Sequence, residues 1–143
     1  GTGSYCLPHG SRVQRFGSQQ ERSHFRRLRP SETLVQITDI GFGTVDWQAV
    51  EPVEVKGETG LAYRRTRTFG DIRVRMVEYT AGYLADHWCD KGHVLLCLEG
   101  ELHVELEDGR SFRLTPGMSY QVADDTEPHR SSTATGAKLF IVD

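Results

Sequence analysis

The sequence has 143 residues, of which 37% are hydrophobic and 26% charged, as expected for a single globular domain with a buried core. No apolar run approaches the roughly 18–20 residues of a membrane span. The formal net charge of -3 is too small to indicate a nucleic-acid or membrane partner. The three cysteines, Cys6, Cys89 and Cys97, form no disulfide framework, so we expect a reduced, cytoplasmic setting.

Residues 1–31 differ from the rest of the chain, because they are rich in Gly, Ser, Gln and Arg and have no sustained hydrophobic period. Residues 1–30 carry six arginines and one acidic residue, whereas the remainder carries eleven basic and nineteen acidic residues. We interpret residues 1–31 as a flexible segment or an added leader. A basic arm for an acidic partner and a strand exchanged with a partner subunit are the alternatives. The folded domain is then expected at 32–143.

Strand signals begin in the next part of the chain. Residues 46–50 suit a short strand or one helical turn, and residues 61–69 suit an exposed strand. The stretch 72–76 alternates strictly between apolar and basic residues, which predicts a half-buried strand. We expect its two arginines, Arg73 and Arg75, on a solvated face. The alternative is that they face a cavity and meet an anionic ligand.

The second half of the chain predicts several short strands separated by Gly, Pro and Asp turns. Apolar and polar residues alternate at 102–106 and 112–114, and the Asp-Gly turn at 107–110 is a strong hairpin signal. Further strands are expected at 120–122 and 138–142. After the first 60 residues no segment combines helical length with a period of 3.6, so the pattern favours an all-β sandwich or barrel.

Two histidines and a cysteine lie within seven residues, directly before an apolar strand. Because residues i and i+2 of a strand share a face, the side chains of His87 and Cys89 can converge on one point, within reach of His93. His129 follows two predicted hairpins later and can lie on a neighbouring strand. Three imidazoles and a thiolate suit a divalent transition metal, with zinc first and iron, nickel or copper as alternatives.

The same residues also have an ordinary structural explanation. A buried histidine is often only a hydrogen-bonded core residue, and a buried cysteine behaves as a small hydrophobe. Cys97 shares a strand face with His93 but lies farther along it, so we assign Cys97 to the core. We interpret His9, His24 and His103 as surface residues because they have no other ligand types around them.

The spacing of these residues resembles the two motifs of the cupin superfamily. The first motif is matched by Gly82, His87, Cys89, His93 and Gly100, and the second by Gly109, Pro116-Gly117 and His129. Cys89 stands where a cupin has its second histidine, and His93 stands where it has glutamate. The run 85–93 also resembles the small bacterial DHCW-motif cupin fold proteins.

This resemblance covers about residues 45–143 and implies an antiparallel jelly-roll β-barrel, often dimeric, with a metal at one mouth. Its implied ligands are His87, Cys89, His93 and His129. It also implies a small-molecule ligand in the barrel and a homodimer, but no settled reaction.

Three functions stay open. A metal-dependent enzyme would use the three histidines as ligands and keep a coordination position free for substrate. A binding module without activity would fill the coordination sphere of the metal with four protein ligands, as structural zinc sites do, or would lack the metal. A redox sensor would use Cys89 and Cys97.

Overall fold

The computed structural model describes residues 35–143, so the interpretation of residues 1–31 lies outside the described residues. The described part contains one short 3-10 helix, Trp47–Ala49, where a strand or a helical turn was expected. Its strands are β1 Val53–Lys56, β2 Leu61–Phe69, β3 Ile72–Tyr79, β4 His93–Gly100, β5 Leu102–Leu106, β6 Ser111–Leu114, β7 Ser119–Val122, β8 His129–Ser132 and β9 Ala137–Val142. No helix in this part is long and apolar enough to cross a membrane.

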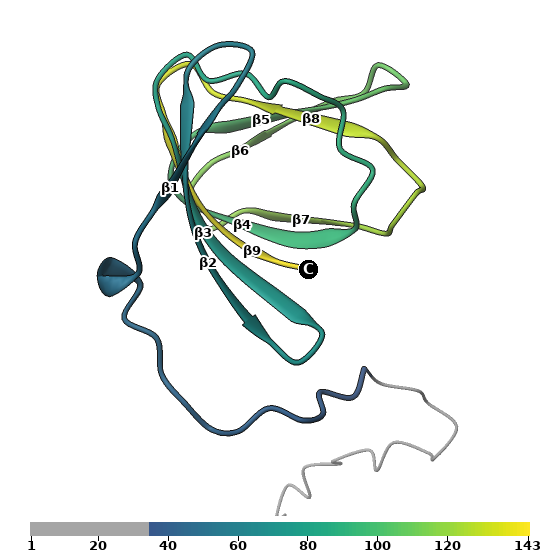
Figure 1. The fold of residues 1–143 in the computed structure, drawn as a ribbon. Coiled ribbons are helices and arrows are strands. Elements are labelled where there is room, and N and C mark those ends of the chain that lie inside the picture. Colours follow the sequence, from purple (N-terminus) through teal and green to yellow (C-terminus); the bar gives the residue numbers. More distant parts are fainter. Residues whose placement is uncertain (1–34) are drawn as a thin grey trace, which may run out of the picture. The chain divides into compact units, whose positions relative to one another are not determined.

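The strands form two antiparallel sheets that face each other (Figure 1). The larger sheet has the strand order β1-β2-β3-β9-β4-β7, and the smaller sheet has the order β6-β5-β8. Neighbours in these sheets are mostly distant in sequence, so the chain passes repeatedly between the two layers. This arrangement confirms the predicted all-β, antiparallel jelly-roll barrel.

The connection between β3 and β4, two strands of the larger sheet, is hydrogen-bonded to β8 of the smaller sheet. It first runs beside β8, where the amide of Ala85 donates to the carbonyl oxygen of Ser131 at 2.9 Å. Farther along, Cys89 and His129 exchange both backbone hydrogen bonds, at 2.8 and 2.9 Å. Two residues of an antiparallel pair that exchange both bonds lie directly opposite each other. The thiol of Cys89 is therefore held beside the first residue of β8.

The apolar core fills the space between the sheets. Leu95, Cys97, Leu102 and Leu139 have almost no exposed surface. The assignment of Cys97 to the core is confirmed, and burial raises the pKa of its thiol. Because side chains alternate along a strand, His93 lies on the same inner face as Leu95 and Cys97 but at the start of β4.

The expected solvated face is wrong for Arg75, whose side chain is 15% exposed, whereas Arg73 is 45% exposed and also lines a cavity. Arg75 is level with Ile141 on β9, and Ile141 is level with Leu95 on β4, both of which are buried. The two arginines therefore belong to the inner face of β3, and both line a cavity there. Alternation predicted the strand correctly but not which of its two faces points inward. Charged residues can face inward where a buried acid pairs with them.

Most of the other predicted strands are confirmed. β5 has the predicted bounds, 102–106, and a turn at 107–110 leads from it to β6. β8 was missed, because its sequence His-Arg-Ser-Ser has no apolar residue and no alternation. Its position in the smaller sheet, hydrogen-bonded to β5, shows that pairing rather than composition makes it a strand.

Candidate metal centre

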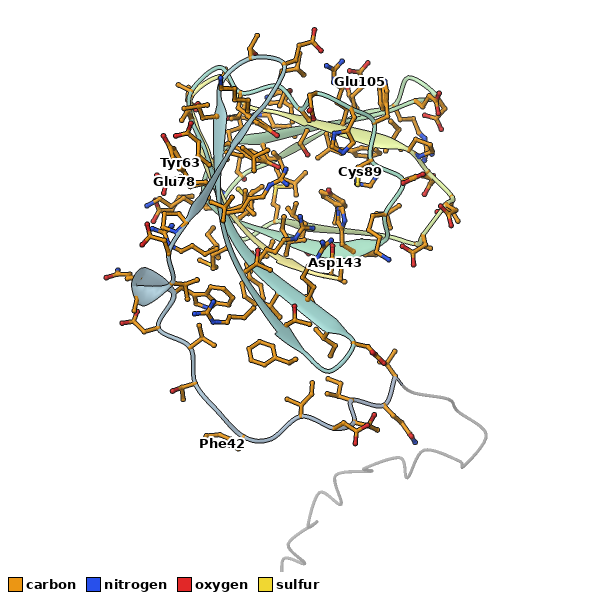
Figure 2. The ribbon with its side chains drawn as sticks, viewed as in Figure 1. Phe42, Tyr63, Glu78, Cys89, Glu105 and Asp143 are labelled. Atoms are coloured by element: carbon orange, nitrogen blue, oxygen red, sulfur yellow. The ribbon has the colours of Figure 1, made fainter. Side chains whose placement is uncertain are left out.

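Three of the four predicted ligands lie together at one mouth of the barrel. One donor atom each from Cys89, His93 and His129 forms a group whose members lie within 4.8 Å of one another. Figure 2 shows Cys89 and Asp143 facing the space between the sheets. Each of the three comes from a different place: the β3–β4 connection, the start of β4 and the start of β8. The site therefore depends on the two sheets coming together.

His129 is held with one nitrogen free for a ligand role. Its Nδ1 lies 3.0 Å from the carbonyl oxygen of Glu127. Because a carbonyl oxygen only accepts, Nδ1 carries the proton and donates a hydrogen bond to it. The Nε2 atom is then an acceptor that points toward His93. Such a backbone contact on the far nitrogen is the arrangement that orients metal-binding histidines. His129 as a whole residue is only 2% exposed, so the orientation of its ring is fixed by its surroundings.

His93 presents the same atom to the same point. Its Nε2 lies 2.8 Å from the hydroxyl of Tyr120 and 3.1 Å from Nε2 of His129. Burial, followed by the charge of His129, lowers the pKa of His93 to about 4. The imidazole is therefore neutral at pH 7, which is the form that binds a metal. Its other nitrogen, Nδ1, is buried without a hydrogen-bond partner.

The donor set fits a transition metal. Two nitrogens bound to one zinc at about 2.0–2.1 Å in tetrahedral geometry lie about 3.3 Å apart, close to the 3.1 Å between the Nε2 atoms. The lone pairs of two neutral imidazoles repel at this distance unless a proton or a cation lies between them. A cysteine sulfur and two histidine nitrogens are also the ligand types that zinc prefers.

His87 is not in this group. Its Nδ1 lies 2.6 Å from a carboxylate oxygen of Asp86, and its side chain is 63% exposed. The expected i, i+2 relation to Cys89 does not bring the two donors together, because the chain bends at residues 86–87. His87 nevertheless lines the same cavity, so its role as a ligand stays a prediction.

A cavity of about 300 Å³ lies next to the three donors. Its floor is apolar, formed by Leu95 and Ile141. Its polar walls are formed by the donors themselves and by Arg64, Arg73, Arg75, Tyr79, Tyr83, Tyr120 and Ser131. A volume of this size is at the lower end of pockets that bind small molecules.

Sequence reasoning missed two residues of this region. Tyr120 was expected only as a strand residue, although its position in a period-2 stretch placed it on one face with Val122. Asp143, whose side chain is only 1% exposed, pairs with Arg73 and Arg75. Nothing local to Asp143 indicates this role, because the pairs join residues about 70 positions apart.

Comparison with solved structures identifies the fold. The chain matches an ectoine synthase from P. lautus with a TM-score of 0.58 and 19% identity, over 71% of this chain and 76% of that one. It matches a sugar phosphate isomerase of the cupin superfamily from Silicibacter pomeroyi with a TM-score of 0.58 and 16% identity, over 70% and 74% of the two chains. It also matches an RmlC-like cupin from Shewanella frigidimarina with a TM-score of 0.57 and 20% identity, over 73% and 91%.

The chain therefore has the cupin fold, and it carries a group of one cysteine and two histidines that could hold a metal. At these identities the likeness concerns the fold alone. No family model and no curated protein matches the sequence. The resemblance to the narrower DHCW-motif group stays a prediction.

Proposed function

We propose that this protein is a single-domain cupin that binds a divalent transition metal, zinc first, at the mouth of its barrel. Cys89, His93 and His129 are the proposed ligands, and a small molecule binds in the adjoining cavity. The convergence of these three donors from three separate segments carries the proposal. Such a metal supplies a Lewis acid that polarises a carbonyl or activates a bound water.

The arrangement favours an open metal site over a closed one. Structural zinc sites normally have four protein ligands, whereas catalytic sites have three and keep one position for water or substrate. The fourth predicted ligand, His87, is bound to Asp86 and lies outside the group of donors. Three ligands beside a cavity therefore support a metal that contacts a small molecule. A binding module closed by His87 is the alternative.

The residues of this site already hold protons in defined places. The Nδ1–H of His129 donates to Glu127, and Tyr120, whose pKa is raised by burial, is a protonated phenol beside His93. Tyr120 is thus positioned to donate a hydrogen bond into the site. The apolar floor of Leu95 and Ile141 excludes water from that side of the cavity.

The metal content of the purified full chain tests the proposal. We expect one transition-metal ion per chain by elemental analysis, and its loss in His93→Ala. The matched control is His103→Ala, because His103 is half exposed and bound to Glu101 on the surface of β5. Metal-free native protein, or equal metal content in the two variants, would contradict the proposal.

The open and closed forms of the site differ in their response to His87→Ala. An open site keeps its metal in this variant, whereas a site closed by His87 binds the metal more weakly. The homodimer expected from the family resemblance belongs to the same proposal. Light scattering of the full chain measures it, with two chains per particle supporting a dimer and one contradicting it.

A further inference from the structure

Positive charge is concentrated on one wall of the cavity. Arg64 of β2 and Arg73 and Arg75 of β3 all line it. Asp143 accepts two hydrogen bonds of 2.7 Å from Arg73 and one of 2.7 Å from Arg75. None of the ion pairs found among residues 35–143 involves Arg64. One carboxylate therefore opposes three guanidinium groups on this wall.

The remaining charged groups of the cavity do not remove this excess. Asp90 and Lys91 line its rim and contribute one charge of each sign. Asp86, which is hydrogen-bonded to His87, adds one negative charge near Arg64 and lowers the positive excess from two charges to one. A bound divalent ion with one thiolate ligand adds a further net positive charge. The cavity is therefore electropositive with or without the metal, which favours an anionic ligand.

Arg75 has hydrogen-bonding capacity that the protein does not use. Its side chain is 15% exposed and its Nη2 binds Asp143, but its Nε is buried without any hydrogen-bond partner. Burial is also the main reason why the pKa of Arg75 is lowered. A buried donor on a charged group is costly to leave unpaired. This atom itself has almost no accessible surface, so an oxyanion in the cavity would contact the exposed part of the same side chain.

Hydroxyl groups surround the same space. Tyr79 and Tyr83 stack with ring centroids 4.0 Å apart, and both line the cavity. Burial raises the pKa of both tyrosines, so each keeps its hydroxyl proton. Guanidinium groups with phenol donors beside them suit the oxygens of a carboxylate or a phosphate.

We propose that Arg64 and Arg75 bind the oxyanion group, a carboxylate or a phosphate, of a small molecule whose other end faces Cys89, His93 and His129. Only the position of that other end rests on the proposed metal function. The cavity of about 300 Å³ limits the ligand to a small one. The buried side chains of Leu95 and Ile141 suit a short apolar part between its two ends.

Calorimetric titration of the full chain tests this inference. The two probes are malonate and inorganic phosphate, and malonamide is the uncharged control of nearly the same shape as malonate. We expect one anion to bind per chain, and malonamide to bind at least about tenfold more weakly than malonate if the carboxylate is preferred. The comparison of malonate with phosphate identifies which oxyanion the site prefers. Binding of neither anion at about 10 mM would overturn the inference.

Substitution on one strand locates the binding. Arg64→Gln removes a charge from the inner face of β2, and Arg67→Gln removes one from the exposed outer face of the same strand. We expect at least about a tenfold loss of affinity in the first and a change within about twofold in the second. Arg64→Lys keeps the charge but loses the planar guanidinium group, so its affinity for the anion should lie between those of the other two variants. Equal affinities in all three would contradict the assignment.

Metal content measured on the same samples separates the two proposals. Protein that holds zinc but binds neither anion contradicts the oxyanion site alone. Protein that binds an anion through Arg64 but holds no metal contradicts the metal function alone. Thermal denaturation of each variant shows that it is folded, so a loss of affinity can be assigned to the missing side chain.

Discussion

The Nε2 atoms of His93 and His129 lie 3.1 Å apart, although the two residues are 36 positions apart in sequence. His93 begins β4 in the larger sheet, and His129 begins β8 in the smaller one. Their rings meet edge to face, with centroids 4.9 Å apart and an angle of 79° between the planes. The contact joins the two sheets at the mouth of the barrel. A cation bound there would link the two layers as well as serve the site, so metal should also stabilise the fold.

The hydroxyl of Tyr120 offers a test of which atoms bind the metal. It lies 2.8 Å from Nε2 of His93, the same atom that the metal would use. If Tyr120 is only a hydrogen-bond donor, metal must displace it. We then expect Tyr120→Phe to bind zinc as tightly as the native protein or up to about fivefold more tightly, since about 1 kcal/mol of hydrogen bonding is no longer lost. Competition with a chelator measures the affinity, and a large loss would make Tyr120 a ligand.

Alkylation distinguishes the two cysteines in the described part of the chain. Cys97 is completely buried and its pKa is raised, so it should stay unmodified in the folded protein. Cys89 is partly exposed and belongs to the metal group. We expect iodoacetamide to modify Cys89 at least about tenfold faster after the metal is removed with a chelator. Peptide mass spectrometry gives the rate at each site, and equal Cys89 rates would contradict coordination by its sulfur.

The fold could be predicted from the sequence where local patterns decide the structure. β5 and its turn to β6 follow from alternation and the Asp-Gly signal, and both have the expected positions. β8 could not be predicted, because its four polar residues become a strand only through their pairing with β5. The phase of β3 could not be predicted either, since it depends on Asp143, a partner about 70 residues away.

The site was predictable to a similar degree. Spacing brought His87, Cys89 and His93 into one hypothesis, and the predicted hairpins added His129, whose donor atom does lie beside those of Cys89 and His93. The strand rule placed His87 beside Cys89, but a bend at residues 86–87 separates their donor atoms. The strand rule assumes an unbroken strand. The sequence at this bend has no glycine or proline from which the bend could be predicted.

Asp143 should make the stability of the barrel depend on pH. Burial tends to raise its pKa from the ordinary 3.8, but the hydrogen bond from Arg73 and the charges of Arg75 and Arg73 outweigh burial, so the pKa is lowered. The unfolded chain then binds this proton more readily than the folded one. The contribution of the pairs is therefore fully present above pH 3.8 and is lost as the pH falls through the lower folded value.

Asp143→Asn should remove that contribution. At pH 7 we expect the free energy of unfolding to fall by about 1.5–3 kcal/mol, the range for hydrogen bonds to charged groups. The difference from the native protein should shrink as the pH falls below 3.8. Urea denaturation at several pH values measures it. Asp71→Asn, in the exposed turn between β2 and β3, is the control and should leave the midpoint unchanged. A difference that stays constant with pH would contradict the ion-pair explanation.

Two glycines of the cupin-like motifs should respond differently to alanine, although both have a positive φ. At Gly100, φ is 75° and an added Cβ would overlap the backbone oxygen of Gly136, so we expect Gly100→Ala to cost more than about 3 kcal/mol or to prevent folding. At Gly109, φ is 95° and the space around it is open, so Gly109→Ala should cost only the backbone strain, about 1 kcal/mol. Thermal and urea denaturation give both values. Both variants carry backbone strain from a positive φ, so the larger loss expected at Gly100 reports the close approach of residues 100 and 136, and equal losses would show that this approach does not exist in solution. A large difference would assign the first motif's final glycine to the closure of the barrel rather than to the chemistry of the site.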